Sequence, residues 1–318
     1  MNFDNLINDY ESLINKELKT IYNIGSKSLV EAFNYVINSN GKRVRPILTL
    51  LTNRVCNGNI QDALSAALSV EMFHDFTLVH DDIMDDDKIR RGLMTVHEKW
   101  DLGTAVLTGD LILSVAMNNL IDNYQNNPKV VQIFTKCLLA VCEGQALDKE
   151  YESKQNISIN EYIKMIDLKT GFLLGMCTEI GAITANANND DTNQLRKYGI
   201  LLGRGFQIQD DYLEIFSDSE KMGKSLQSDI ILNKKTFLMI LANAKCPKSI
   251  QNAIELSKKD FNKCVDEVRQ ILVDEGIKKE TEKKINEIFS EANKILDDLN
   301  LDTDHLHSYS MHILKRRR

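Results

Sequence analysis

Apolar residues recur at every third or fourth position along nearly the whole chain, which is the spacing of amphipathic α-helices. Residues 3–20 show this pattern, with an apolar face made by Phe3, Leu6, Ile7, Tyr10, Leu13, Ile14 and Leu18. The same spacing predicts helices over residues 3–20, 28–38, 46–55, 60–85, 94–99, 103–125, 129–151, 160–186, 191–216, 227–245, 249–273 and 277–298. No segment shows the alternation of a half-buried strand.

The predicted helices follow one another with short joints, and no low-complexity tract or short repeat separates them. Proline and glycine are sparse, at 3 and 15 of 318 residues, and Pro128 and Pro247 mark joints between helices. The pattern predicts one all-α domain spanning residues 1–318, a helical bundle large enough to enclose a deep central apolar cavity. Part of its apolar surface is expected to form a subunit interface.

Charge and cysteine content argue against several classes of protein. The formal net charge of −7 argues against broad nucleic-acid binding. The chain has no uninterrupted run of about eighteen apolar residues, and its amino terminus has no basic start before an apolar stretch. Neither a transmembrane helix nor a signal peptide is therefore predicted. The six cysteines have no metal-binding spacing and are expected to be small buried residues of a cytoplasmic protein.

Two acidic clusters, about 130 residues apart, are the strongest chemical signal in the chain. They are Asp81-Asp82-Ile83-Met84-Asp85 and Asp210-Asp211-Tyr212-Leu213-Glu214, each with two adjacent acids and a third one three residues later. On a helix, the first and last acids of each cluster lie on one face, one turn apart. One such run usually lies on a solvated helix surface. Two runs with matched spacing, each beside apolar residues, indicate a site, because carboxylates in apolar surroundings are costly unless cations compensate them. Mg²⁺ suits carboxylates combined with substrate phosphates, so the pair predicts a Mg²⁺-diphosphate site between two facing helices.

Basic residues supply the positive charge that two diphosphates need beyond metal ions. They occur in Gly41-Lys42-Arg43-Val44-Arg45-Pro46, Arg90-Arg91, Lys169-Thr170, Lys224 and Lys234-Lys235-Thr236. Arginine binds phosphate through two parallel hydrogen bonds, and lysine binds it as a compact charge. Arg43 and Lys235 are expected to be ordinary solvated cations. The basic tail Lys315-Arg316-Arg317-Arg318 either is solvated or closes over an anionic substrate.

Together these segments resemble the trans-prenyl diphosphate synthases, also called polyprenyl synthetases, from Gly41 to Thr236. The motifs that carry the resemblance are the first cluster leading into Arg90-Arg91-Gly92, Gly144-Gln145-Ala146-Leu147-Asp148, Lys169-Thr170, Gly203-x-Gly205-Phe206-Gln207-x-x-Asp210-Asp211-x-x-Glu214 and Gly223-Lys224. The resemblance implies a single-domain isoprenoid-synthase-type bundle, a homodimer, and head-to-tail condensation of isopentenyl diphosphate with an allylic diphosphate. Glu214 stands where an aspartate is usual, and Gln227, near Asp229, stands where a glycine is common.

The resemblance also implies a role for each site residue. Three Mg²⁺ ions would be held by the acidic residues of the two clusters, Asp81, Asp82, Asp85, Asp210, Asp211 and Glu214. Asp81, Asp85 and Asp210 would bind metal directly. Asp82, Asp211, Glu214 and Asp148 would orient the ligands. The allylic diphosphate would be bound by Arg90, Lys169, Lys224 and Lys234. Isopentenyl diphosphate would be bound without metal by Lys42, Arg45, His74 and Arg91. The allylic cation would be flanked by the Thr170 hydroxyl, the Gln207 side-chain oxygen and the Lys169 carbonyl.

Residues just before the first cluster are expected to set the product length. Helical spacing puts Phe73, Phe76 and Thr77 one to two turns before Asp81, where bulky residues form a cavity floor or simply pack in the core. In the family, an aromatic residue at the position of Phe76 shortens the product, and a second one at the position of Thr77 would shorten it further. Geranylgeranyl diphosphate is therefore the expected product, with farnesyl diphosphate next.

Three other functions remain open. A longer-chain polyprenyl diphosphate synthase is disfavoured by Phe73 and Phe76. A terpene cyclase usually lacks the isopentenyl-site residues Lys42, Arg45 and Arg91. A non-catalytic subunit of a heteromeric prenyl synthase typically loses one acidic motif, whereas this chain keeps both.

Overall fold

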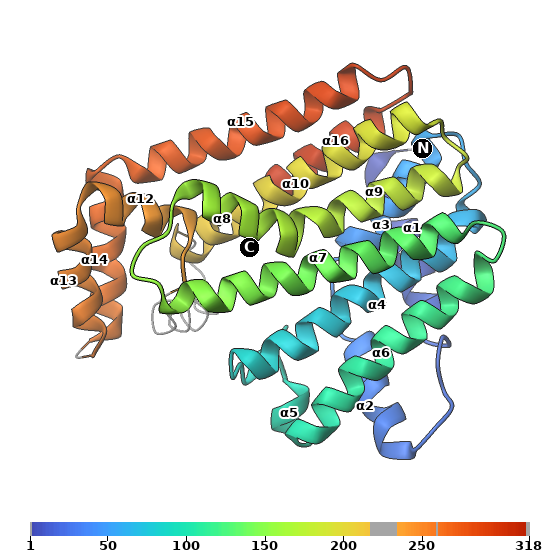
Figure 1. Cartoon of the computed structure of the whole chain (residues 1–318), viewed down its shortest axis with the longest axis horizontal. Helices are drawn as coiled ribbons and strands as arrows, with labels where there is room; N and C mark the ends of the chain where they lie inside the picture. The colour runs from blue at the N-terminus through green and yellow to red at the C-terminus, as the bar shows by residue number, and fades with distance from the viewer. Residues whose placement is uncertain (1, 217–233, 259, 316–318) are drawn as a thin grey trace. The chain divides into compact units, whose positions relative to one another are not determined.

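The computed structural model describes residues 2–216, 234–258 and 260–315, and nearly all of its regular structure is helical (Figure 1). The α-helices are α1 (Phe3–Leu18), α2 (Lys27–Ile37), α3 (Val44–Val55), α4 (Ile60–Met84), α5 (Val96–Lys99), α6 (Leu102–Asn123), α7 (Pro128–Ser153), α8 (Ile159–Ile166), α9 (Phe172–Thr184), α10 (Asn189–Phe216), α12 (Phe237–Lys245), α13 (Pro247–Glu255), α14 (Phe261–Asp274), α15 (Ile277–Asp297) and α16 (Asp304–Leu314). The π-helix η1 (Asp167–Gly171) joins α8 to α9, the 3₁₀ turn η2 (Leu256–Lys258) follows α13, and β1 (Ile89–Arg90) and β2 (Leu93–Met94) form a small hairpin.

The chain forms two compact units. Unit 1 comprises Met1–Lys136, Met176–Leu195 and Asn300–Leu306, and unit 2 comprises Cys137–Gly175, Arg196–Leu299 and His307–Arg318. The all-α prediction is confirmed. The expectation of a single domain over 1–318 stays a prediction.

Helix α4 is the central helix of unit 1. It packs along α6 and α3 (Figure 1), and it is buried on all sides from Ala66 to Phe73, where every residue is buried. Asn59 caps its amino terminus by accepting a hydrogen bond from the Gln61 amide. Its carboxyl end carries the first acidic cluster, so a rigid buried helix positions these carboxylates.

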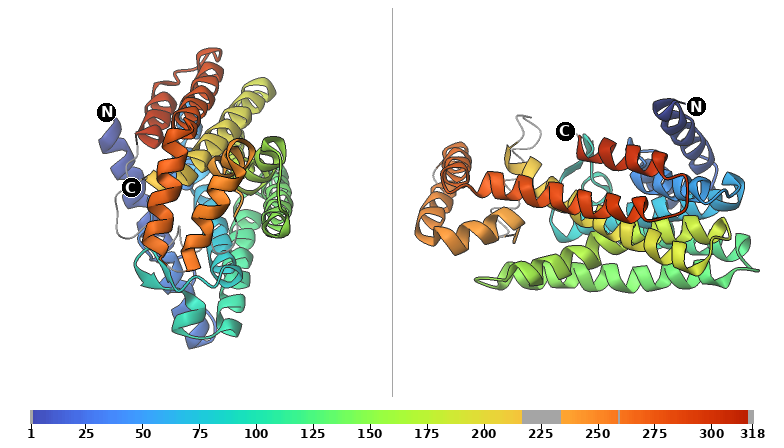
Figure 2. Two further views of the ribbon diagram at one scale, coloured as in Figure 1. Left: turned by 90° about the vertical axis from the view of Figure 1, so that its left-hand side faces the viewer. Right: turned by 90° about the horizontal axis from the view of Figure 1, so that it is seen from above.

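The far end of unit 2 has its own apolar core. Helices α13 and α14 pack side by side, with α12 and α15 beside them (Figure 2). Leu238, Ile250, Val268 and Leu272 from these helices are buried in the same cluster as Ile215 of α10. Because Ile215 directly follows Glu214, this core anchors the end of the second acidic cluster.

The structure differs from the prediction in several segments. Residues 160–186 form the predicted helix as α8, η1 and α9, which follow one another directly, but the helix includes a π-helical turn. Residues 249–273 form two helices, α13 and α14, because Asp260 starts a new helix by capping the Lys263 amide. Helix α16 and the hairpin were not predicted. The predicted helix 227–245 begins outside the described residues, which contain its second half as α12.

The hairpin turn carries the paired arginines. Arg91 and Gly92 occupy its two central positions with φ of +52° and +80°, a tight turn that needs positive φ at both residues. Such a two-residue strand pair is too short for the alternating pattern to reveal it in the sequence.

Candidate active site

The first acidic cluster lies at the carboxyl end of α4 in unit 1. Asp81 and Asp85 are half-buried, whereas Asp82 is buried and accepts a hydrogen bond from Arg90 Nε. The second nitrogen of that guanidinium, Nη2, lies 3.1 Å from Asp87 Oδ2. Burial raises the pKa of Asp82 to about 6, although Arg90 opposes the shift. Asp82 thus holds Arg90 in place, which favours an orienting role for it over direct metal binding.

A corner at residues 41–45 brings Arg91 against the start of α3. A Cβ on Gly41 would stand 3.0 Å from Arg91 Nη1, so a side chain there would displace the guanidinium by a few tenths of an ångström. Arg91 Nη1 also donates to Ser39 Oγ at 3.0 Å and lies 3.5 Å from Asp75 Oδ1. The hairpin and the corner therefore position Arg91 together.

His74 lies among guanidinium groups. Burial, and then the charges of Arg45, Arg91, Arg90 and Arg43, hold the pKa of His74 well below its usual range. The imidazole is therefore neutral at physiological pH and adds no charge to the cluster. Of the four predicted isopentenyl-site residues, His74, Arg45 and Arg91 come together in unit 1, and Lys42 is exposed on the same corner.

Arg43 is not the solvated cation that the sequence suggested. Its side chain is buried and its Nη1 lies 2.8 Å from Glu71 Oε1. It also donates to the side chain of Asn15 and to the carbonyl oxygens of Ile37 and Ser39. Arg43 adopts φ of +46° at the amino terminus of α3, and these bonds hold the corner in that conformation.

Asp75 is a site residue that the sequence did not reveal. It is fully buried on α4, and neither of its carboxylate oxygens has a hydrogen-bond partner in the described structure. Burial and the neighbouring Glu71 raise its pKa to about 8, against the opposing charges of Arg91, Arg43 and Arg45. The available signal was its four-residue spacing from Glu71 on a helix that is otherwise apolar there.

The predicted cavity floor is an aromatic cluster in unit 1. Phe73 is fully buried and its ring centroid lies 6.1 Å from Phe76 and 5.0 Å from Phe134 of α7. Phe76 is half-buried and packs edge-on against His80 at 4.8 Å. Thr77 donates to the His74 carbonyl oxygen at 2.7 Å. The sequence did not single out Phe134, whose buried helical stripe with Val130 was its only signal.

In unit 2, Lys169 lies on the π-helix η1. Its Nζ is 2.6 Å from Asp148 Oδ2 of α7. A Cβ on Gly144 would stand 2.4 Å from the Lys169 amide nitrogen, and one on Gly203 of α10 would stand 2.8 Å from Gly171 Cα. These glycines allow the backbones of α7, η1 and α10 to pack against one another, and π-helical turns are frequent at functional sites.

A chain of hydrogen bonds joins Thr170 to the second acidic cluster. The Thr170 hydroxyl donates to Gln207 Oε1 at 2.9 Å, and Gln207 Nε2 donates to Asp211 Oδ1 at 3.1 Å. Asp211 Oδ2 accepts from the buried Tyr162 hydroxyl at 2.6 Å and from the Phe237 amide at 3.3 Å. Asp211 thus ties α8 and the start of α12 to α10, which favours an orienting role for it. Tyr162, which the sequence did not reveal, completes this network.

The remaining predicted residues of unit 2 are only partly described. Asp210 and Glu214 are half-buried on α10, and Lys234 is half-buried before α12. Lys235 is buried, not solvated as expected, and burial lowers the pKa of its amine. Lys224, Gly223, Gln227 and Asp229 lie outside the described residues, as does the end of the basic tail.

Among the cysteines, the burial prediction fails at Cys142, which is exposed on α7, and Cys56 is half-buried. The other four are buried, as expected.

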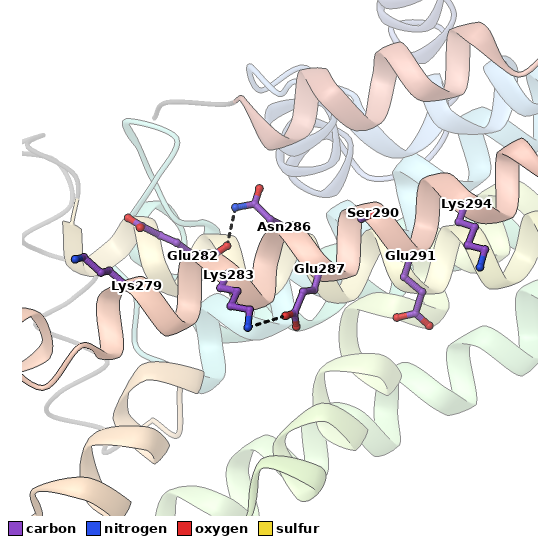
Figure 3. A pocket seen from close by; sticks show the side chains of 8 residues that line it. All are labelled: Lys279, Glu282, Lys283, Asn286, Glu287, Ser290, Glu291 and Lys294. Carbon is purple, nitrogen blue, oxygen red and sulfur yellow. Dashed lines mark hydrogen bonds and ion pairs between the residues drawn. The ribbon is translucent and has the colours of Figure 1, made fainter.

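Unit 2 also has a shallow groove on α15, and no predicted site residue lines it (Figure 3). Its lining side chains alternate in charge on one helix, and Lys283 pairs with Glu287 at 3.6 Å. This is the pattern of a solvated helix face.

These features are those of an all-helical protein with clustered carboxylates and cations, the class that the motifs predicted. Each unit carries one acidic helix and one set of cations. The comparisons with known proteins lead to the same class. A crystal structure of a geranylgeranyl pyrophosphate synthase has a TM-score of 0.91 and 33% sequence identity, covering 98% of this chain and 99% of that chain.

The family is equally clear from sequence. The family model for polyprenyl synthetase matches residues 26–274. The geranylgeranyl diphosphate synthase of Sulfolobus acidocaldarius is 39% identical over 249 residues, which is 77% of this chain and 76% of that protein. The geranylfarnesyl diphosphate synthase of Natronomonas pharaonis is 36% identical over 234 residues, which is 67% of this chain and 68% of that protein. The chain belongs to the polyprenyl synthetase family, as its motifs predicted.

Proposed function

We propose that this protein is a short-chain trans-prenyl diphosphate synthase that condenses isopentenyl diphosphate with allylic diphosphates and forms geranylgeranyl diphosphate. The observation that carries the proposal is that each unit holds a connected half of such a site. Unit 1 holds the first acidic cluster with His74 and Arg91, and unit 2 holds Lys169 paired with Asp148 and Thr170 bonded to Gln207.

The acidic clusters fit Mg²⁺. Every candidate donor is a carboxylate oxygen, which Mg²⁺ prefers, and none of the six is a nitrogen or sulfur ligand. Asp81, Asp85 and Asp210 would bind the ions directly, as the family resemblance implies. Asp82 and Asp211, which accept hydrogen bonds from Arg90 and Tyr162, would orient the groups around them. When bound, the ions neutralise the diphosphate that leaves the allylic carbon.

The chain's own residues handle the allylic cation. The Thr170 hydroxyl donates a hydrogen bond to Gln207 Oε1, and Asp211 accepts one from the Gln207 amide nitrogen. The lone pairs of the Thr170 oxygen therefore point elsewhere and can stabilise positive charge on the substrate. Preorganised dipoles of this kind stabilise charge that develops in a transition state.

Isopentenyl diphosphate would bind at the arginine corner of unit 1. Arg91 is braced by Ser39 and Gly41, so its guanidinium is held before the substrate arrives. His74 is a weak base at this corner, because burial and the surrounding guanidinium groups lower its pKa. The departing diphosphate is the expected proton acceptor in the elimination step.

We propose that the aromatic cluster before Asp81, the predicted cavity floor, limits the length of the product. Phe76 is half-buried while Phe73 lies wholly in the core, so Phe76 is the ring that can limit chain growth. Relatives named geranylgeranyl and geranylfarnesyl synthases match the chain at similar identity, so the family alone does not decide between product lengths. The second candidate product is farnesyl diphosphate.

We also propose a cytoplasmic homodimer that is not membrane-spanning. Helix α6 exposes Leu102, Val106, Leu107 and Ile121, of which Leu107 and Ile121 lie on the side opposite its buried residues. Both α6 and α7 meet the length and hydropathy of a membrane span, but each has charged residues, and exposed apolar helices of this kind also form subunit interfaces.

The test is product analysis with purified protein, labelled isopentenyl diphosphate and ten- or fifteen-carbon allylic starters. A twenty-carbon product that disappears with EDTA and returns with Mg²⁺ is expected. Products of thirty carbons or more would favour a longer-chain synthase. The absence of turnover with every starter would favour a non-catalytic subunit.

A further inference from the structure

A second group of potential metal ligands lies in unit 1 outside the two predicted clusters. It consists of Asp86, His97 and Glu98, whose ligand atoms all lie within 4.8 Å of one another. Asp86 follows α4, and the other two residues belong to α5, on the far side of the hairpin that carries Arg90 and Arg91. The group therefore joins the two ends of the arginine hairpin.

His97 is the observation that points to a ligand. Its side chain is only 10% exposed, and neither ring nitrogen has a hydrogen-bond partner in the described structure. Its Nε2 lies 4.0 Å from Asp86 Oδ1 and 4.0 Å from Glu98 Oε1. These separations are too long for hydrogen bonds, and a buried imidazole without partners is costly.

Asp86 occupies a backbone position that glycine usually takes. The Asp87 amide donates to the Asp82 carbonyl oxygen at 3.0 Å, so α4 ends in a Schellman motif with Asp86 at its left-handed residue. Asp86 adopts φ of +54° there, which strains a side-chain-bearing residue. Its carboxylate is 84% exposed and can therefore move onto an ion.

The spacing of the three atoms suits an ion between them. A point equidistant from atoms 4.0 to 4.8 Å apart lies about 2.3–2.5 Å from each. Zinc binds imidazole nitrogen and carboxylate oxygen at about 2.0–2.2 Å, so a shift of a few tenths of an ångström completes the site. Imidazole suits Zn²⁺, Cu²⁺, Fe²⁺ and Ni²⁺, whereas Mg²⁺ prefers ligands that are all oxygen.

We propose that Asp86, His97 and Glu98 bind a divalent transition-metal ion, represented by Zn²⁺, at a site separate from the Mg²⁺ clusters. The ion bridges the end of α4 and helix α5 and so fixes the hairpin between them. Its two carboxylates and one imidazole leave a position for water, as in other zinc sites with three protein ligands. The proposal does not depend on the catalytic function proposed above.

The test is Zn²⁺ binding to the full chain in a large excess of Mg²⁺, measured by competition with a chromophoric chelator. One tight equivalent is expected, with an imidazole nitrogen seen at about 2.0–2.1 Å by X-ray absorption. His97→Gln should weaken Zn²⁺ binding by at least ~10-fold, because even replacing a residue that only hydrogen-bonds to a metal ligand lowers metal affinity by about that much. Glu98→Gln and Asp86→Asn, at more exposed positions, should do the same if His97→Gln does not fold.

The matched control is His307→Gln. His307 also faces one carboxylate, Asp297 Oδ1 at 3.1 Å, but belongs to unit 2. The His307→Gln variant should bind Zn²⁺ with the affinity of the wild type. Unchanged affinity in His97→Gln, Glu98→Gln and Asp86→Asn, zinc with oxygen ligands only, or loss of the tight equivalent in Asp81→Asn would each overturn the proposal.

Discussion

Buried charge in unit 1 is concentrated on Arg43, Glu71 and Asp75. Arg43 donates hydrogen bonds to Glu71, Asn15 and two carbonyl oxygens, so its charge is well compensated. Asp75 has only the longer approaches of Arg91 at 3.5 Å and Arg43 at 3.9 Å. Its ionised form is therefore the costly one.

Asp75→Asn should flatten the pH dependence of stability. Because the pKa of Asp75 is raised to about 8 in the folded protein, the stability that its neutral form contributes is present at low pH and is lost as pH rises through 8. Asparagine stays neutral, so the variant should gain on the wild type between pH 5 and 9, by at least about 1 kcal/mol, the value of one pKa unit. Denaturant unfolding at several pH values measures this gain. A constant difference, or an equal gain in the exposed control Asp9→Asn, would contradict it.

Phe76→Ala should lengthen the product. Removing the half-buried ring opens space before Asp81, while the fully buried Phe73 keeps the core filled. Chromatography should show products longer by one or more five-carbon units, with unfolding weakened by less than the ~3–5 kcal/mol typical of a fully buried phenylalanine. The control Phe33→Leu, in the core of α2, should keep the original product. An unchanged product from Phe76→Ala would remove this ring from the floor.

At the scale of elements, η1 positions Lys169 and Thr170, two residues of the proposed site. A π-helical turn adds a residue to the helix and carries Lys169 and Thr170 on adjacent positions. Lys169 reaches Asp148 on α7, and Thr170 reaches Gln207 on α10. The two contacts depend on the close packing that Gly144 and Gly203 allow.

Gly144→Ala should reduce turnover without unfolding the protein. The new Cβ would lie 2.4 Å from the Lys169 amide nitrogen, a backbone atom that cannot move aside without shifting η1. Because displaced catalytic groups lose positioning, kcat should fall by about 10²-fold. Gly103→Ala is the control, since its Cβ meets only the Asp101 side chain at 3.1 Å. Wild-type kcat in Gly144→Ala would show that η1 tolerates the shift.

At the scale of the whole molecule, the apolar surface of α6 has no cover within the described chain. Leu107 is 59% exposed, and Ile121, which is 50% exposed, lies on the same side of the helix. Exposed apolar residues on one side of a helix are typical of association surfaces. A second copy of the chain is the cover that we propose.

Leu107→Lys should shift the protein from dimer to monomer. Burying a lysine charge in an apolar interface without a partner is costly, and one such change can exceed the stability of a dimer at micromolar concentration. Light scattering after size exclusion measures the mass of the assembly. The control Ile24→Lys changes a residue that is 75% exposed in the loop before α2 and should leave the dimer intact. A dimer that persists in Leu107→Lys would place the interface elsewhere.

Local patterns predicted most helices and singled out the candidate site residues. This was possible because a helix face and an acidic spacing depend on neighbours a few residues away. Pro128 and Pro247 begin α7 and α13 as expected. The same patterns could not separate α13 from α14, since the apolar spacing continues across the Asp260 cap. The sign of each charge was visible, but its burial was not, and Arg43 and Lys235 were misjudged for that reason.

The amino-acid sequence by itself determined the helical class, the two acidic clusters, the basic segments and the polyprenyl synthetase family. These features are encoded in residue types at fixed local spacings. Only the tertiary structure showed that Asp75 lies between Arg91 and Arg43, that Tyr162 secures Asp211, and that His97 lies between two carboxylates. Such relations join residues that are distant in the chain, and the burial and partners that set their chemistry exist only once the helices have packed.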